Sequence, residues 1–322
     1  KNSMTSRERL MAILRREVVD RPAVNFYEIG WMSKDPSVYG TGGSAMDPTD
    51  PDPFNVHNDP SWKPLLALAE QSTDLIRMRA PILKDPAGSP REEFFKTTDF
   101  VKDGSRFTRS EIHVGGRVLS QLNRRDPEVS TSWCIEHLLK EREDVLAYLE
   151  LPDEVFAREP DVSPMIEEDR RVGERGIVMV DTGDPICSVA PLFSMQDFTV
   201  FAFTENALCH RLLEKLAPPL YAITEKVAQA FPGHLWRIYG PEYATEPYLP
   251  SPLFNEYVVN YTKPMVDTIK QHGGYARVHC HGRIGNALPH FAAMGADAID
   301  PIEPPPQGNV YLADVRRDYG KD

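Results

Sequence analysis

Short apolar runs alternate with longer amphipathic segments through the C-terminal half of the chain. Four of the runs predict β-strands: "IVMVD" (177–181), "LWRIYG" (235–240), "YARVHC" (275–280) and "DAIDPI" (297–302). Between them, apolar residues recur at helical spacing over 205–230, 253–272 and 284–294. Strands that alternate with helices predict a parallel sheet. The pattern favours an α/β fold of the (β/α)8 TIM-barrel type, in which the loops after the strands build the active site.

The N-terminal part of the chain has a more mixed pattern. "MTSRERLMAILRRE" predicts a helix that is capped by Thr5 or Ser6. Strands are expected at "AVNFYEIG" (23–30) and "LIRMRA" (75–80). Residues 33–62 are rich in Pro, Asp, Gly and Ser without periodicity, which predicts a long loop between these strands.

Residues 90–122 alternate between polar and apolar positions and contain two glycine turns, which predicts an excursion of antiparallel hairpins from the barrel. A helix is expected next, over 136–147. We therefore expect a single barrel domain over 1–322. A closed barrel would need one or two more strands after Asp322, so either the chain is truncated or the barrel is irregular.

Composition and charge narrow the classes of protein. Of 322 residues, 41% are apolar and 26% charged, and the net charge of −12 comes with no basic run longer than two residues. Nucleic acid is therefore not an expected partner, because binding to phosphates requires a basic face. The apolar runs are too short to cross a membrane, and the N-terminus has no signal-peptide pattern. Four cysteines without C-x-x-C spacing indicate reduced thiols and a cytoplasmic location.

Two histidines stand at the end of the predicted strand in "YARVHCHG" (275–282). Side chains alternate along a strand, so His279 and His281 share a side and Cys280 points to the other. Two imidazoles at the carboxyl end of a barrel strand are a beginning for a Zn²⁺ site. The alternative is that one histidine caps a neighbouring helix and the other is solvated.

A catalytic zinc needs three protein ligands and an open position. Glu242, in the loop after the preceding strand, is the candidate for the third ligand and for a catalytic carboxylate. An exposed loop carboxylate would explain the same residue. Glu246 and Glu303 are weaker candidates, and Cys280 is most simply a buried small apolar residue.

Other polar residues also follow predicted strands. Asp184, in "DTGDP", is a candidate for proton transfer, or it forms an Asx-turn that fixes the loop. Glu28 lies at the end of the first predicted strand and is a candidate for substrate binding. Tyr239, Tyr243 and Tyr248 crowd one loop, where either a planar ligand or ordinary packing would explain them.

Two segments resemble the uroporphyrinogen decarboxylase superfamily. "TSRERLMAILRREVVDRPAV" is similar to its opening helix and Asp-Arg-x-Pro turn, and the run 251–304 is similar to its later barrel strands. The true decarboxylases carry an arginine-rich R-Q-A-G-R-Y segment after the first strand. This chain reads "NFYEIGWMSKDPSVYG" there, without arginine, which argues against tetrapyrrole decarboxylation.

The other branch of that superfamily comprises zinc-dependent, corrinoid-linked methyltransferases with His-x-Cys-Gly and a later cysteine. His279 falls on the histidine of that motif, and His281 replaces its first cysteine. The later cysteine would lie beyond Asp322. The resemblance implies zinc at His279 and His281 and a corrinoid cofactor on a partner protein. An imidazole in place of a thiolate leaves the metal more electrophilic, which favours O-demethylation of a methoxylated substrate.

Three alternatives remain open at this point. A metal-free, decarboxylase-like lyase would need cationic residues at the pocket, and Arg277 and Arg283 are the nearby candidates. A metal-dependent hydrolase is the second. In amidohydrolases, however, His-x-His resembles a feature of the first barrel strand, whereas in this chain the pair stands on a late strand. A barrel that binds a ligand without catalysis is the third.

Overall fold

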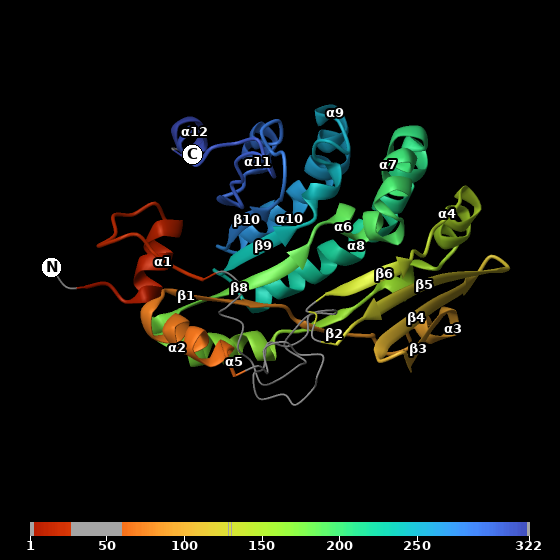
Figure 1. Cartoon of the computed structure of the whole chain (residues 1–322), viewed down its shortest axis with the longest axis horizontal. Helices are drawn as coiled ribbons and strands as arrows, with labels where there is room; N and C mark the ends of the chain where they lie inside the picture. Colours follow the sequence, from red (N-terminus) through yellow and green to blue (C-terminus); the bar gives the residue numbers. More distant parts are fainter. Residues whose placement is uncertain (1–2, 27–59, 128, 130, 321–322) are drawn as a thin grey trace.

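A computed structural model describes residues 3–26, 60–127, 129 and 131–320. Its centre is a sheet of five parallel strands in the order β1-β8-β9-β10-β11 (Figure 1). The strands are β1 Leu75–Arg79, β8 Gly176–Gly183, β9 Leu235–Tyr239, β10 Tyr275–His279 and β11 Ala298–Asp300. The predicted α/β class is thus confirmed. In the described ranges this sheet is open between β1 and β11, so the closed (β/α)8 barrel stays a prediction.

Helices connect the strands and cover one face of the sheet. The helix α5 (Ser163–Val172) lies between β1 and β8, the later connections are α8 (Asn206–Ala230), α10 (Asn260–Gln271) and α11 (Leu288–Met294), and α12 (Leu312–Tyr319) follows β11. Val180, Trp236 and Ala276 on the strands pack against Val227 of α8 and Ile269 of α10. Burying these apolar side chains fixes which face of each strand points toward the helices.

The helix α1 (Ser6–Leu14) covers the opposite face of the sheet. Thr5 and Glu8 form a capping box at its start, as the sequence predicts for this position. Leu10 packs on Met179 and Leu235, and the buried Arg9 forms an ion pair with Asp74 at 2.6 Å.

On this second face, the rows of residues in register change from apolar to polar toward the carboxyl ends of the strands. Met179, Leu235 and Tyr275 are partners in one row, and Asp181, Arg237 and Arg277 form the next row. At the carboxyl edge, Gly183, Tyr239, His279 and Asp300 are in register. Strand alternation therefore directs the polar residues of β8 to β11 to one side and one end of the sheet.

A second, antiparallel sheet occupies the end of the molecule opposite α1 (Figure 1). Its strands are β3 Phe95–Lys102, β4 Ser105–Val114, β5 Arg117–Arg125 and β6 Ser132–Glu136. The sequence predicts hairpins only over 90–122. The sheet extends to Glu136 because "SWCIE" pairs with β5, and the helix expected at 136–147 consequently occupies Arg142–Leu149 as α4.

Shorter elements complete the described chain. They are α2 Trp62–Ser72, β2 Ile82–Lys84, α3 Arg91–Phe94, β7 Glu159–Asp161, α6 Pro185–Val189, α7 Met195–Thr204, α9 Ser251–Phe254 and the π-helical turn Asn255–Val259 that joins α9 to α10. The helix expected over 284–294 begins only at Leu288. Of the strand predicted at 23–30, residues 23–26 are not in a strand and the rest lies outside the described residues, as does most of the 33–62 loop.

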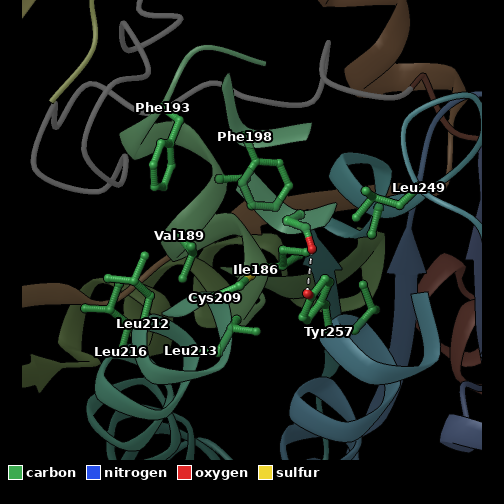
Figure 2. Packing of buried hydrophobic residues seen from close by; sticks show 14 of the residues in the cluster. Ile186, Val189, Phe193, Phe198, Cys209, Leu212, Leu213, Leu216, Leu249 and Tyr257 are labelled. Carbon is green, nitrogen blue, oxygen red and sulfur yellow. Dashed lines mark hydrogen bonds between the residues drawn. The ribbon is translucent and has the colours of Figure 1, made fainter. Parts of the chain in front are cut away.

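The largest apolar cluster lies where α6, α7, α8 and the π-helical turn meet (Figure 2). Ile186, Phe198 and Leu213 are fully buried there. Tyr257 is also fully buried, and its hydroxyl donates a hydrogen bond of 2.8 Å to the carbonyl of Ala202. This cluster anchors the loops that follow β8 and β9, so it supports the carboxyl edge of the sheet.

Truncating Phe198 tests that support. Phe198→Ala should lower the free energy of unfolding by roughly 3–5 kcal/mol, because a fully buried aromatic ring leaves a cavity. The matched control is Phe203→Ala on the same helix, where the side chain is 53% exposed and the expected change is below about 1 kcal/mol. Urea denaturation of both variants measures the difference, and equal losses would contradict the packing described.

Candidate functional site

Two histidines and two carboxylates meet at the carboxyl ends of β10 and β11. His279 ends β10 and is buried, whereas the side chain of His281, in the following loop, is 57% exposed. Their ring centroids are 4.7 Å apart at an interplanar angle of 85°. The two imidazoles therefore lie together, as strand alternation predicts.

Each histidine is held by a carboxylate from the next strand or its loop. The Nδ1 atom of His279 is 2.8 Å from Oδ2 of Asp300, and Nδ1 of His281 is 3.0 Å from Oε1 of Glu303. Glu303 also accepts a hydrogen bond of 2.6 Å from the backbone N–H of Gly282. Both rings consequently have a fixed partner on the same nitrogen.

The carboxylate of Asp300 is held in its ionised form. Burial raises its pKa, but hydrogen bonds from His279 and Arg277 outweigh that effect and lower the pKa to about 2. Glu303 behaves similarly: burial raises its pKa, and the bonds from Gly282 and His281 lower it by more. Both groups remain hydrogen-bond acceptors for the imidazoles at neutral pH.

A cavity of about 370 Å³ opens beside His281. Its walls combine carboxylate, aromatic and thioether groups, and they include Glu242, Glu246, Tyr243, Tyr248, Met195 and Arg283. The carboxylate of Glu242 accepts a hydrogen bond of 3.1 Å from the backbone N–H of Gly240. Glu242 and His281 thus share one cavity, as expected of two groups that act on the same ligand.

The donor chemistry at this edge fits a zinc ion in part. An imidazole whose Nδ1–H is held by a carboxylate presents Nε2 as the metal-binding nitrogen, which is the common arrangement around zinc. Within the described residues, however, no three His, Cys, Asp or Glu side chains are grouped closely enough to hold a metal. His279 and His281 lie next to each other, whereas Glu242 is bonded to the N–H of Gly240, so zinc binding by these three residues stays a prediction.

Cys280 takes no part in this arrangement. It is 1% exposed and packs in the apolar cluster with Val278 and Ile284. Burial raises the pKa of its thiol well above the ordinary value, so it stays protonated. The prediction of a small buried apolar residue describes this position. None of the four cysteines forms a disulfide.

Asp184 has the surroundings of a helix cap. It is fully buried, and Oδ1 accepts a hydrogen bond of 2.9 Å from the N–H of Cys187 at the start of α6. Oδ2 accepts one of 3.3 Å from Thr262 on α10. The backbone N–H of Asp184 donates to the carbonyl of Tyr239 at 2.8 Å. The loop-fixing role expected of an Asx residue accounts for these contacts, and the catalytic role stays a prediction.

The predicted substrate-binding residues separate into different environments. Tyr243 lines the cavity, and burial raises its pKa to about 12, with the charge of Glu242 adding to the effect. Tyr239 lies on the sheet beside His279, with its ring centroid 5.0 Å from the guanidinium of Arg237. Glu28 lies outside the described residues.

Sequence reasoning missed Asp300 as the partner of His279 and considered Glu303 only as a weak metal ligand. A signal for both is present in "DPIEP" (300–304), at the end of the next predicted strand. The carboxyl ends of neighbouring parallel strands meet at one edge of a sheet, so these carboxylates fall beside "HCHG". That neighbourhood requires the strand order, which the pattern alone does not contain.

Within the described ranges, no single helix is both long and apolar enough to cross a membrane. The segments Pro185–Leu192 and Met195–Thr204 reach that length and composition only as a pair, which is bent by 112°.

Comparisons with known proteins add a likeness of fold. No protein-family model and no curated protein matches this chain. Among solved structures, the chain is similar to a methyltransferase from Methanosarcina mazei, with 12% sequence identity and a TM-score of 0.47 over 92% of this chain and 76% of that one. At that identity and TM-score the likeness carries no argument, and any function has to be inferred from the site.

The fold and the site together define a class. The chain is an α/β protein whose parallel sheet collects two carboxylate-held imidazoles and a small cavity at its carboxyl edge.

Asp184 predicts a dependence of stability on pH. Complete burial is the main cause that raises its pKa from 3.8 to about 8, with the charge of Glu242 adding to it. A carboxyl with a raised folded-state pKa contributes stability that is fully present below its unfolded pKa. That contribution is lost as the pH rises from about 4 to about 8, and the free energy of unfolding falls by about 1.4 kcal/mol for each pH unit in this window.

Asp184→Asn removes this titration, because the amide cannot ionise and still caps a helix. Its free energy of unfolding should therefore improve relative to the wild type as the pH rises through that window. Urea denaturation at several pH values measures the difference, with Asp153→Asn at an exposed position as the control for losing one carboxylate. A difference that does not change with pH would mean that folded Asp184 is ionised throughout.

Proposed function

We propose that this protein is a zinc-dependent methyltransferase that moves a methyl group from a methoxylated, aromatic substrate to a corrinoid cofactor on a partner protein. The observation that carries the metal part is the pair of adjacent imidazoles, His279 and His281, each held at Nδ1 by a carboxylate. The resemblance of residues 251–304 to the uroporphyrinogen decarboxylase superfamily, with His279 and His281 at the positions of the His-x-Cys-Gly motif of its corrinoid-linked methyltransferases, supplies the reaction class.

His279 and His281 would hold the zinc through Nε2, with Asp300 and Glu303 as their supporting acceptors. Glu242 is the proposed third ligand, because it faces the cavity that His281 also lines. To act as a ligand, its carboxylate would exchange the hydrogen bond from Gly240 for the metal. When bound, zinc would supply a Lewis acid that makes the ether oxygen a better leaving group.

The residues of the chain would orient the substrate and control protons around it. Tyr243, Tyr248 and Met195 supply flat and polarisable walls for an aromatic ring. Glu242 and Glu246 both line the cavity, and Glu242, where it is not a metal ligand, is the one proposed to exchange a proton with a bound substrate. Asp184 is fully buried, and its pKa, which burial and the charge of Glu242 raise, suits it to retain a proton near neutral pH and fix the loop.

The charge balance favours this function over a metal-free decarboxylase-like lyase. Such a lyase needs cations that are available to substrate carboxylates, and Arg277 and Arg283 are the candidates. Arg277 is 2.6 Å from Asp300, and Arg283 approaches Glu246 at 3.9 Å. Both guanidinium groups already face carboxylates of the chain, so an anionic substrate gains less from them.

Metal content is the first test. We expect about one zinc per chain in the wild type and none in His279→Ala or His281→Ala, because two of the ligands are imidazoles. Elemental analysis of dialysed, folded protein measures it. The matched control is His272→Ala, which removes a surface histidine that is also paired with a carboxylate, Glu225, at 2.9 Å. Zinc retained in both site variants, or absent from the wild type, would contradict the proposed metal site.

Methyl transfer is the second test. Wild-type protein with cob(I)alamin and 2-methoxyphenol should form methylcobalamin, which has a distinct absorption spectrum. Glu242→Gln should lower the rate by roughly 100-fold or more if this carboxylate is a ligand or proton carrier. Glu167→Gln, at an exposed position on α5, should leave the rate unchanged. A series of aryl and alkyl methyl ethers that all fail to give methylcobalamin would contradict the reaction class.

A further inference from the structure

Two arginines stand side by side in the polar row below the candidate site. Arg237 of β9 and Arg277 of β10 are in direct register on the face of the sheet that α1 covers. Each is largely buried and bound to one carboxylate on its outer side: Arg237 to Asp181 at 2.7 Å, and Arg277 to Asp300 at 2.6 Å. The two ion pairs thus join the same residue types at similar burial on neighbouring strands, but Asp181 is in register with Arg237, whereas Asp300 is in register with His279.

The two ion pairs differ in whether their carboxylate also contacts a histidine. Asp300 uses Oδ1 for the Nε atom of Arg277 and Oδ2 for Nδ1 of His279. Asp181 lies on β8, which β9 separates from the strand of His279. Of the two arginine–carboxylate pairs, only the one at Arg277 continues directly to a candidate metal ligand.

The guanidinium of Arg277 is held on a second side. Its Nη1 atom lies 3.9 Å from the sulfur of Met179, which belongs to the apolar row below. A carboxylate that has one oxygen bound to a fixed guanidinium cannot rotate freely about its Cβ–Cγ bond. The other oxygen therefore stays directed at the imidazole of His279.

We propose that Arg277 is a positioning residue for His279. It fixes Asp300, Asp300 accepts the Nδ1–H of His279, and the ring is thereby held in the tautomer and orientation that present Nε2 to a metal. The metal part of this inference rests on the proposed function. The tautomer of His279 does not, because it is a property of the chain without metal.

The first experiment measures that tautomer. Long-range ¹⁵N–¹H spectra of ¹⁵N-histidine-labelled, metal-free protein at mildly alkaline pH distinguish Nδ1–H from Nε2–H, and His279→Gln assigns the signal. We expect wild-type His279 to be protonated on Nδ1, and Arg277→Met to show a mixture of the two tautomers. Arg237→Met, the matched change one strand away, should leave the His279 signal at its wild-type position.

The second experiment measures zinc affinity by competition with a chromophoric chelator. Loss of a supporting contact to a metal ligand lowers affinity by about 10- to 100-fold, so we expect a loss of that order in Arg277→Met and a value near wild type in Arg237→Met. Should either methionine variant fail to fold, Arg277→Lys and Arg237→Lys allow the same comparison. In that pair, only the change at Arg277 should disturb His279.

The tautomer measurement and the zinc measurement together distinguish the positioning role of Arg277 from the proposed function. An Nδ1–H tautomer that survives unchanged in Arg277→Met, or equal effects of the changes at Arg277 and Arg237, would overturn the positioning role. A wild-type protein that binds no zinc but shows the tautomer shift in Arg277→Met would contradict the proposed function and support the role of Arg277.

Discussion

The parallel register of β10 with its two neighbours is the constraint on which the candidate site depends. It places His279 level with Tyr239 on one side and with Asp300 on the other. Side chains in register on adjacent strands point the same way, so a histidine and a carboxylate that are 21 residues apart come within hydrogen-bond distance. A slip by one residue would turn His279 toward the helices and bring Cys280 to the site.

Electrostatics at this edge follow from how each charged group is partnered. Asp300 and Glu303 keep lowered pKa values because they accept several hydrogen bonds, whereas Asp184 has a raised pKa because it is fully buried. The surroundings of each carboxyl group therefore decide its state: Asp300 and Glu303 stay ionised and accept hydrogen bonds, whereas Asp184 retains its proton and caps a helix. The ionised pair supports the imidazoles, and the neutral cap lets β8, α6 and α10 meet without burying a charge.

The arrangement connects the apolar framework to the proposed chemistry. Apolar packing among α6, α7, α8 and the π-helical turn supports the loops after β8 and β9, which carry Asp184, Glu242 and Tyr243. On the face that α1 covers, the row of arginine–carboxylate pairs lies between the apolar row of Met179, Leu235 and Tyr275 and the histidines. The positions of the histidines at the carboxyl edge therefore depend on the rows of residues beneath them, which agrees with the general need of metal ligands for supporting contacts.

The sequence by itself determined the α/β class, the main strands and helices, and the shared side of His279 and His281, because these follow from local periodicity. It also indicated Cys280 as buried and Asp184 as a loop-fixing residue. Only the tertiary structure decided that Asp300 and Glu303 hold the histidines, and that Arg277 holds Asp300. Those contacts join residues on different strands, so they depend on strand order and register, which no local pattern of residues contains.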